Sequence, residues 1–297
     1  MPLIIHNHNY KIDSMPFLLD DILQLILNDK SKKYYLIVPT GKMSRKIKLD
    51  LVFNNFSHTT SPIKDPKVMT LNKFAEIFFN NLFADKNYRK ISDAFSRVLF
   101  EEADELSNLQ FFKGNNKKSN PVILDKLSNI ILGLKEDGIL PFNLEKDLEN
   151  VHHSGISHIQ KYQDIYELYK NYEIKLGDNL IDSKSILIKI NQKLINSDYA
   201  KLINNIFDKD TVVIFYGFTE FRQPEIQFLS FFNNTNLDFA INFDFSSING
   251  PLFGNLNEII SNFVSVGFLK YDTDIMYNQA APDAQFDISD PHISPGK

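Results

Sequence analysis

The residues Pro39-Thr40-Gly41-Lys42-Met43-Ser44 combine hydroxyls, a glycine and a lysine between an apolar run and a basic helical pattern. A nucleotide phosphate loop has these components in this place. The Walker A motif, however, also requires a glycine five residues before its Gly-Lys pair, so that the backbone can wrap around phosphate, and position 36 here is Leu. Met43 stands where the motif has Ser or Thr. The sequence therefore predicts that ATP is not bound at this loop.

What remains is the start of a predicted helix that carries Thr40, Lys42, Ser44 and Arg45. Backbone amides at a helix start, together with hydroxyl and cationic side chains, suit a single phosphate group. A phosphate of a nucleic-acid backbone would fit this description. The alternative is an ordinary solvated basic first turn, and these residues alone leave both interpretations open.

A second candidate lies in the run from Val213 to Phe221, where a buried strand pattern ends. A Walker B motif would put a magnesium-binding Asp and a catalytic Glu at such a strand end. Those positions hold Tyr216 and Gly217, and Glu220 comes later in the turn. We interpret Glu220 as a helix-capping acid. No metal site is predicted here.

The remaining chemistry-bearing groups indicate no catalytic site. His6-Asn7-His8 and His152-His153 with His158 lack the third ligand and fixed geometry that zinc needs, so we interpret them as solvent-exposed loop histidines. The acidic run from Glu101 to Glu105 is typical of a solvated helix face. The sequence has no Cys, which excludes disulfides, thiolate zinc sites, cysteine nucleophiles and iron–sulfur clusters within it.

Composition sets further limits. With 297 residues, 43% of them hydrophobic, the chain has enough apolar material for a substantial core. A net charge of −5 argues against binding of nucleic acid through a positive charge spread over the whole surface. A local basic groove is still compatible with this net charge. No apolar run is long enough to span a membrane and no leader pattern is present, so we expect a soluble, cytoplasmic protein without a membrane partner.

Hydrophobic periodicity predicts an alternation of helices and short buried strands near both ends of the chain. The predicted strands are 34–38, 67–70, 211–216 and 237–243, and the helices between or beside them are 17–26, 42–53, 71–83 and 224–232. From about Ile91 to Ile206 strand signals largely vanish, and helices are predicted at 95–109, 122–136 and 156–175.

This order predicts an α/β fold of the P-loop-helicase-like kind, in which a parallel sheet is interrupted by an all-helical subdomain. The α/β domain would be discontinuous, with residues 1–90 and 207–271, and residues 91–206 would form the helical insertion. Residues 272–297 are polar and proline-containing, which is typical of a disordered or truncated tail.

In this order, the motifs resemble the AddB (RexB) family, the nuclease subunits of bacterial AddAB helicase-nucleases, whose N-terminal half is related to superfamily 1 helicases. The likeness covers about Tyr34 to Phe245. Leu36–Thr40 is similar to helicase motif Ia, Val68–Ala75 to the Thr-and-aromatic motif that follows, and Leu127–Asp182 to the inserted 1B-like subdomain. The most specific piece is Tyr216–Phe221 with Pro224, Glu225 and Gln227, which resembles an altered Walker B segment.

The resemblance implies a DNA-binding, scaffold-like helicase fold in a subunit that processes double-strand breaks in recombinational repair and pairs with an AddA-like motor subunit. Single-stranded or double-stranded DNA would be contacted by Thr40, Lys42, Thr70, Phe74, Thr219 and Gln227. For Phe74 the favoured alternative to base stacking is core packing, because aromatic residues at helical spacing usually face inward.

Departures from the family pattern leave other readings open. The N-terminus, which carries a Walker A loop in many family members, has none from His6 to Asp13. The family's nuclease domain, with its carboxylates and often an iron–sulfur site, would lie beyond residue 297, so the chain is either a fragment or a nuclease-less remnant and its enzymatic activity is left open. The alternatives are an active NTPase that uses Gly41-Lys42, and a protein-interaction domain without DNA contact.

Overall fold

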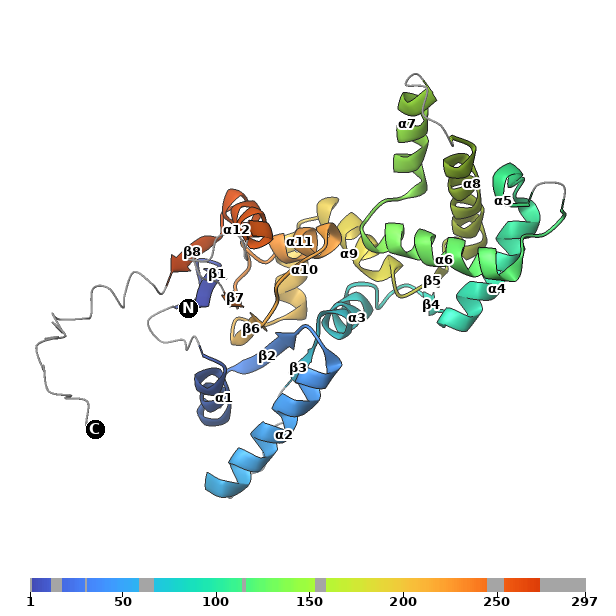
Figure 1. The fold of residues 1–297 in the computed structure, drawn as a ribbon. Helices are drawn as coiled ribbons and strands as arrows, with labels where there is room; N and C mark the ends of the chain where they lie inside the picture. Colours follow the sequence, from blue (N-terminus) through green and yellow to red (C-terminus); the bar gives the residue numbers. More distant parts are fainter. Residues whose placement is uncertain are drawn as a thin grey trace, which may run out of the picture.

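The computed structural model describes residues 2–11, 18–29, 31–58, 67–113, 116–152, 159–244 and 254–272. Within them, a six-stranded mixed sheet has the strand order β3-β2-β6-β7-β1-β8 (Figure 1). Its strands are β1 (Pro2–His6), β2 (Lys33–Val38), β3 (Lys67–Thr70), β6 (Thr211–Tyr216), β7 (Asp238–Asp244) and β8 (Leu269–Asp272). The first four strands in this order are parallel to one another, and β1 is antiparallel to both of its neighbours.

Both faces of the sheet are covered by helices, which explains why β2 and β6 are almost continuously apolar. Alternate residues of β2 enter two different hydrophobic clusters: Leu36 packs on one face and Ile37 on the other. Helices α1 (Leu19–Asn28) and α2 (Gly41–His58) cover the Leu36 face. The Ile37 face is covered by α3 (Leu71–Leu82), α9 (Ser185–Ile195), α10 (Tyr199–Ile206), α11 (Gln223–Ser230) and α12 (Gly254–Ser265).

Phenylalanine rings make up much of the larger cluster. Phe74 and Phe78 of α3 contact Phe207, Phe228 and Phe232 with ring centroids 5.2–6.1 Å apart. These distances are those of favourable aromatic pairs. The high phenylalanine content of the sequence is therefore largely a property of the core beneath this face.

A helical lobe lies to one side of the sheet (Figure 1). It contains α4 (Asp93–Leu106), α5 (Gln110–Lys113), α6 (Pro121–Glu136), α7 (Pro141–His152) and α8 (Ile159–Leu176), and has its own hydrophobic cluster, in which Phe100 stacks on Tyr172 with centroids 4.0 Å apart. A short parallel ladder of β4 (Arg89–Lys90) and β5 (Leu180–Ile181) lies where the chain enters and leaves the lobe. Helices α9 and α10, which the sequence grouped with the helical block, pack on the sheet instead. The division into domains stays a prediction.

The predicted α/β class with a mostly parallel sheet is confirmed, and so are its four predicted strands. Sequence patterns missed β1, β8, the ladder β4-β5 and α12. The predicted beginnings of the helices 17–26 and 156–175 lie outside the described residues, as does the predicted tail except Asp272, the last residue of β8. No helix among the described residues is both long enough and apolar enough to cross a bilayer.

An ionic network is buried where the lobe meets the sheet. The Lys135 ammonium of α6 lies 2.7 Å from Asp182 and 2.6 Å from Glu173, and its side chain is 2% exposed. Asp182 also accepts hydrogen bonds from Tyr172 and from the backbone amide of Ser185 near the start of α9. Burial alone would raise the pKa of Asp182, but Lys135 and these hydrogen bonds outweigh it and hold the pKa below its ordinary value. The network thus joins α6, α8 and α9.

We expect Lys135→Met to lower the free energy of unfolding by about 3 kcal/mol or more, because it leaves the Asp182 carboxylate buried without its counter-charge. Lys126→Met, at an exposed lysine of the same helix, should change the free energy of unfolding little. Urea unfolding followed by circular dichroism measures both. If both substitutions changed the free energy of unfolding equally, the network would not be important for stability.

The same network predicts a pH dependence. Because the folded-state pKa of Asp182 is depressed, its stabilisation is fully present above the ordinary value of 3.8 and is lost as the pH falls through the folded-state pKa. The stability advantage of the wild type over Asp182→Asn should therefore shrink as the pH falls below about 4. Urea unfolding of both proteins over a pH series tests this, and an advantage that stays constant into the acid range would refute it.

Candidate functional site

The carboxyl ends of three neighbouring parallel strands meet at one edge of the sheet. Val38 of β2 is the register partner of Thr70 of β3, and Ile37 is the partner of Phe215 of β6. The segments that follow these strands therefore begin side by side. Ligands of open α/β sheets bind outside this edge, and it is where the structure brings together four of the six predicted DNA contacts: Thr40, Lys42, Thr70 and Thr219.

Helix α2 begins at this edge, directly after Pro39 and Thr40. The Thr40 hydroxyl accepts a hydrogen bond from the Met43 amide at 3.2 Å and so caps the helix. The amides of Gly41 and Lys42 are among those that a helix start leaves without an intrahelical acceptor. Both Thr40 and Lys42 are exposed. The predicted phosphate-binding turn is therefore an accessible helix N-terminus, and Thr40 also has a structural role as its cap.

The Ser44 hydroxyl fixes this helix start to the sheet. Ser44 is buried, and its Oγ donates to the carbonyl oxygen of Val68 in β3 at 2.9 Å. Ser44 was one of the residues predicted to suit a phosphate group, and for its side chain that prediction is wrong, because the hydroxyl is hydrogen-bonded to the strand. The serine positions α2 rather than a ligand.

The turn after β6 packs against the same helix start. Gly217 has φ +78°, a left-handed conformation that favours glycine. A Cβ atom built at Gly217 would lie 3.3 Å from Cε of Met43 and 4.0 Å from Cδ of Pro39. Thr219 lies two residues farther along this turn and is exposed. The close approach explains why Gly217 stands where a Walker B motif would have an acid.

Thr70 and Phe74 have different environments although they lie one helical turn apart. Thr70 is half-buried at the end of β3, and its hydroxyl accepts a long hydrogen bond of 3.4 Å from the Lys73 amide at the start of α3. Phe74 is fully buried, between Tyr35 and the phenylalanines of the core. The structure therefore corrects the assignment of Phe74 as a DNA contact: its ring has no accessible face for a base, and it packs in the core.

Gln227 does not belong to the carboxyl edge. It is exposed in the second turn of α11, where it lines a groove of about 360 Å³ with Gln223, Asn262 and neighbouring residues of the turn after α6. At the start of α11, Glu225 accepts a hydrogen bond from the Arg222 amide at 2.8 Å. Burial raises the pKa of Glu225, although Arg222 opposes this shift. Glu225, rather than the predicted Glu220, is thus the acid seen capping this helix.

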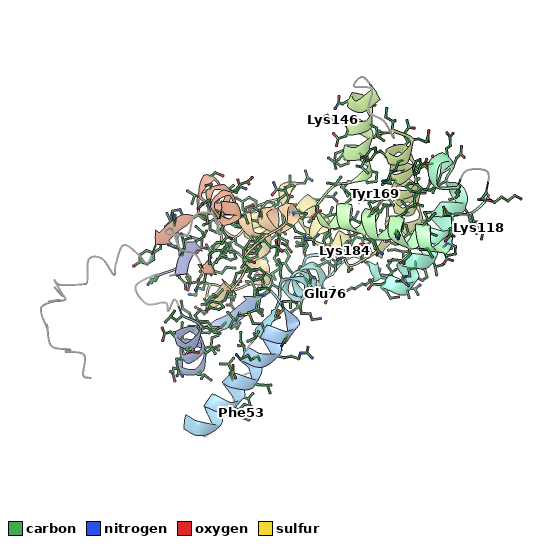
Figure 2. The ribbon with its side chains drawn as sticks, viewed as in Figure 1. Phe53, Glu76, Lys118, Lys146, Tyr169 and Lys184 are labelled. Atoms are coloured by element: carbon green, nitrogen blue, oxygen red, sulfur yellow. The ribbon has the colours of Figure 1, made fainter. Side chains whose placement is uncertain are left out.

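Arg222, which no sequence pattern singled out, joins this turn to the helical lobe. Its guanidinium lies 3.0 Å from both Glu136 and Asp137 at the end of α6, and Lys184 lies 2.7 Å from Glu136. Figure 2 shows Lys184 at this junction, between the sheet and the lobe. The spacing of Arg222 from these acids along the chain gives no signal of the contact, because it arises only from the tertiary fold.

The start of α2 contributes cations to this edge. Its first turn contains no acid, and Lys42, Arg45 and Lys46 are all exposed in its first two turns. Among the described residues, no carboxylate lies within ion-pair distance of these three cations. Cations at the positive end of a helix dipole are unfavourable for the helix itself but reinforce its attraction for anions. The arrangement can bind a phosphate group.

The prediction that the histidines are solvent-exposed loop residues is correct for His8 and wrong for His6. His6 is buried in β1 with its Nδ1 2.9 Å from the carbonyl oxygen of Asn7, so its assignment to an exposed loop is wrong. Burial lowers the pKa of His6, which favours the neutral ring. His8 is exposed as predicted, and the side chains of the second histidine group lie outside the described residues. No cluster of metal-ligating side chains is found in the described part of the chain.

Comparison with protein families gives one match of high coverage. The family described as ADDB, N-terminal, matches residues 13–243, which is well over half of the chain and includes the three strand ends of the carboxyl edge and the entire helical lobe. No curated protein matches the chain.

We expect Gly217→Ala to lower the free energy of unfolding by about 1–2 kcal/mol, since alanine is strained at positive φ and its Cβ would press on Met43. Gly133→Ala is the matched control: Gly133 lies inside α6 with open space around its Cβ position, so alanine should stabilise the helix by up to about 1 kcal/mol. Thermal and urea unfolding measure both changes. Stabilisation by both substitutions would show that the turn is not constrained.

Proposed function

The chain belongs to the AddB N-terminal family, and from this premise we propose that it is a helicase-like DNA-binding scaffold without ATPase activity of its own. Family membership assigns it in broad terms to an AddB-type subunit in DNA repair. The proposed role is to guide DNA during double-strand break processing, in the cytoplasm and in partnership with an AddA-like motor subunit. Thr40, Lys42, Thr70 and Thr219 would lie along the DNA backbone.

The observation that carries this proposal is the exposed, basic start of α2 at the carboxyl edge of the sheet. Phosphate contacts require accessible amides and cations, and Gly41, Lys42 and Arg45 supply them. The wider surface need not be basic, because the binding energy comes from a local set of cations within the −5 net charge of the chain.

The proposal that ATP is not used here is supported by both strand ends. Leu36 is a buried residue in the middle of β2, so no glycine-rich loop can wrap around a phosphate chain at that point. At the end of β6, Tyr216 and Gly217 offer no carboxylate for magnesium. The active NTPase therefore has less support than DNA binding. The protein-interaction alternative would have gained support from a buried Thr40 and Lys42, but both are exposed.

The test is fluorescence anisotropy of single-stranded DNA across a salt series. We expect Lys42→Ala to weaken binding several-fold and to reduce the slope of log affinity against log salt by about 0.7, because one phosphate contact is lost. Lys146→Ala on α7, an exposed lysine in the lobe far from the edge (Figure 2), should leave the affinity and slope unchanged. Added ATP should not change the DNA affinity of the wild type or of either variant.

Two results would overturn the proposal. Absence of binding by the wild type at low salt would remove the DNA role from this part of the protein. Equal effects of Lys42→Ala and Lys146→Ala would mean that binding follows net charge and that the carboxyl edge is not the site. The same titration with double-stranded DNA of equal length compares the affinities for single-stranded and double-stranded DNA.

A further inference from the structure

The turn between β6 and α11 is fixed at both of its ends. At its beginning, Gly217 lies against the start of α2, where a Cβ atom on the glycine would come within 3.3 Å of Met43. At its end, Pro224 packs on Gly138, which follows α6 of the helical lobe, and a Cβ atom on Gly138 would lie 2.9 Å from Cγ of the proline (Figure 1). Exposed Thr219 lies between these two contacts. The turn with this proposed DNA contact is therefore held by the lobe as well as by the sheet.

The side chains inside the turn connect its two ends. Phe218 and Phe221 are both buried, and their rings stack with centroids 4.8 Å apart at an angle of 15°. Phe221 also makes edge contacts with Phe243 and Phe263, with centroids 6.1 and 6.2 Å apart. Close-packed interiors have low compressibility and transmit strain. A displacement of the turn at its lobe end should therefore reach Thr219.

Polar contacts set the direction of the lobe end of the turn. The Arg222 guanidinium lies 3.0 Å from a carboxylate oxygen of Glu136 and 3.0 Å from one of Asp137. On the sheet side, Nδ2 of Asn191 donates to the carbonyl oxygen of Pro224 at 2.8 Å. Contacts to two carboxylates restrict the orientation of a guanidinium more than one contact does. Because partly exposed ion pairs add little stability, their main effect here is on the orientation of the turn.

We propose that Gly138 and Arg222 are positioning residues for the proposed DNA site. Through them, the helical lobe sets the place of Thr219 beside the start of α2. This inference rests on the proposed function, in which Thr219 and Lys42 contact one DNA backbone. On this assignment neither Gly138 nor Arg222 contacts DNA, and their effect on DNA affinity passes through Thr219.

The test compares Gly138→Ala with Gly177→Ala in single-stranded DNA binding, measured by fluorescence anisotropy. Both glycines follow helices of the lobe and have positive φ, +83° and +60°, so alanine strains the backbone at both. A Cβ atom at Gly177 would have as its nearest neighbour only the backbone oxygen of Ile174, 3.9 Å away, and so would press on no other element. We expect Gly138→Ala to weaken DNA binding several-fold and Gly177→Ala to leave it unchanged, although both variants lose stability in urea unfolding.

Arg222→Gln is the second variant, because it removes both ion pairs without introducing a steric clash. It should weaken DNA binding several-fold and leave the slope of log affinity against log salt unchanged, since no cation that contacts phosphate is lost. Arg222→Lys, which keeps a positive charge beside both acids, should restore part of the affinity. A reduced slope in Arg222→Gln would mean that Arg222 binds phosphate directly, and this would overturn its positioning role.

A double-mutant cycle with Thr219→Ala separates positioning from a general loss of stability. Thr219→Ala alone should weaken DNA binding, and Gly138→Ala should then weaken it much less in this background than in the wild type. Equal effects of Gly138→Ala in both backgrounds would overturn the inference, as would unchanged DNA affinity in both Gly138→Ala and Arg222→Gln. Failure of the proposed function is distinguishable, since in that case the wild type itself shows no salt-sensitive DNA binding.

Discussion

The parallel pairing of β2 with β3 on one side and with β6 on the other is the constraint on which the candidate site depends. Because the three strands run in one direction, Thr70 at the end of β3 lies at the same edge as Thr40 and Thr219, which follow β2 and β6. An antiparallel β6 would put Thr219 at the opposite edge. The pairing is stabilised by burial on both faces, since Leu36 and Ile37 of β2 enter different hydrophobic clusters.

The lobe depends on that sheet through a second set of contacts. Arg222 follows the turn at the carboxyl edge and pairs with acids at the end of α6, while Pro224 packs so closely on Gly138 that a Cβ there would lie 2.9 Å from its Cγ. The ion pairs of Arg222 are partly exposed and individually weak. The buried Lys135–Asp182 pair and the glycine–proline contact therefore restrain the lobe more strongly than the surface charges do.

The sequence was sufficient for the parts of the fold with unambiguous periodicity. The runs at β2 and β6 are continuous and apolar because helices cover both of their faces, and helices α1 and α3 have clear amphipathic spacing. β1 was missed because its apolar residues Leu3 to Ile5 are few and run into a polar sequence. β8 was missed because Leu269-Lys270-Tyr271-Asp272 has no apolar run, and its strand state comes from pairing with β1.

The site could be predicted only as far as it follows strand ends. Thr70 ends a predicted strand, and Thr40, Lys42 and Thr219 come shortly after one, so the topology alone brought them to one edge. Phe74 was ambiguous because spacing on a helix does not say which side meets a core, and His6 was misread because the strand that buries it was missed. The Arg222 contacts join residues about 85 positions apart, which no local pattern encodes.

Helix α2 shows how an electrostatically unfavourable start is tolerated. Lys42, Arg45 and Lys46 lie where the helix dipole is positive, and they destabilise an isolated helix. Tertiary contacts offset this effect: Ser44 is hydrogen-bonded to β3, and Ile47 and Leu51 are buried against the sheet. Because packing rather than local charge determines that the helix forms, its exposed side chains are free to have binding chemistry that the helix alone would disfavour.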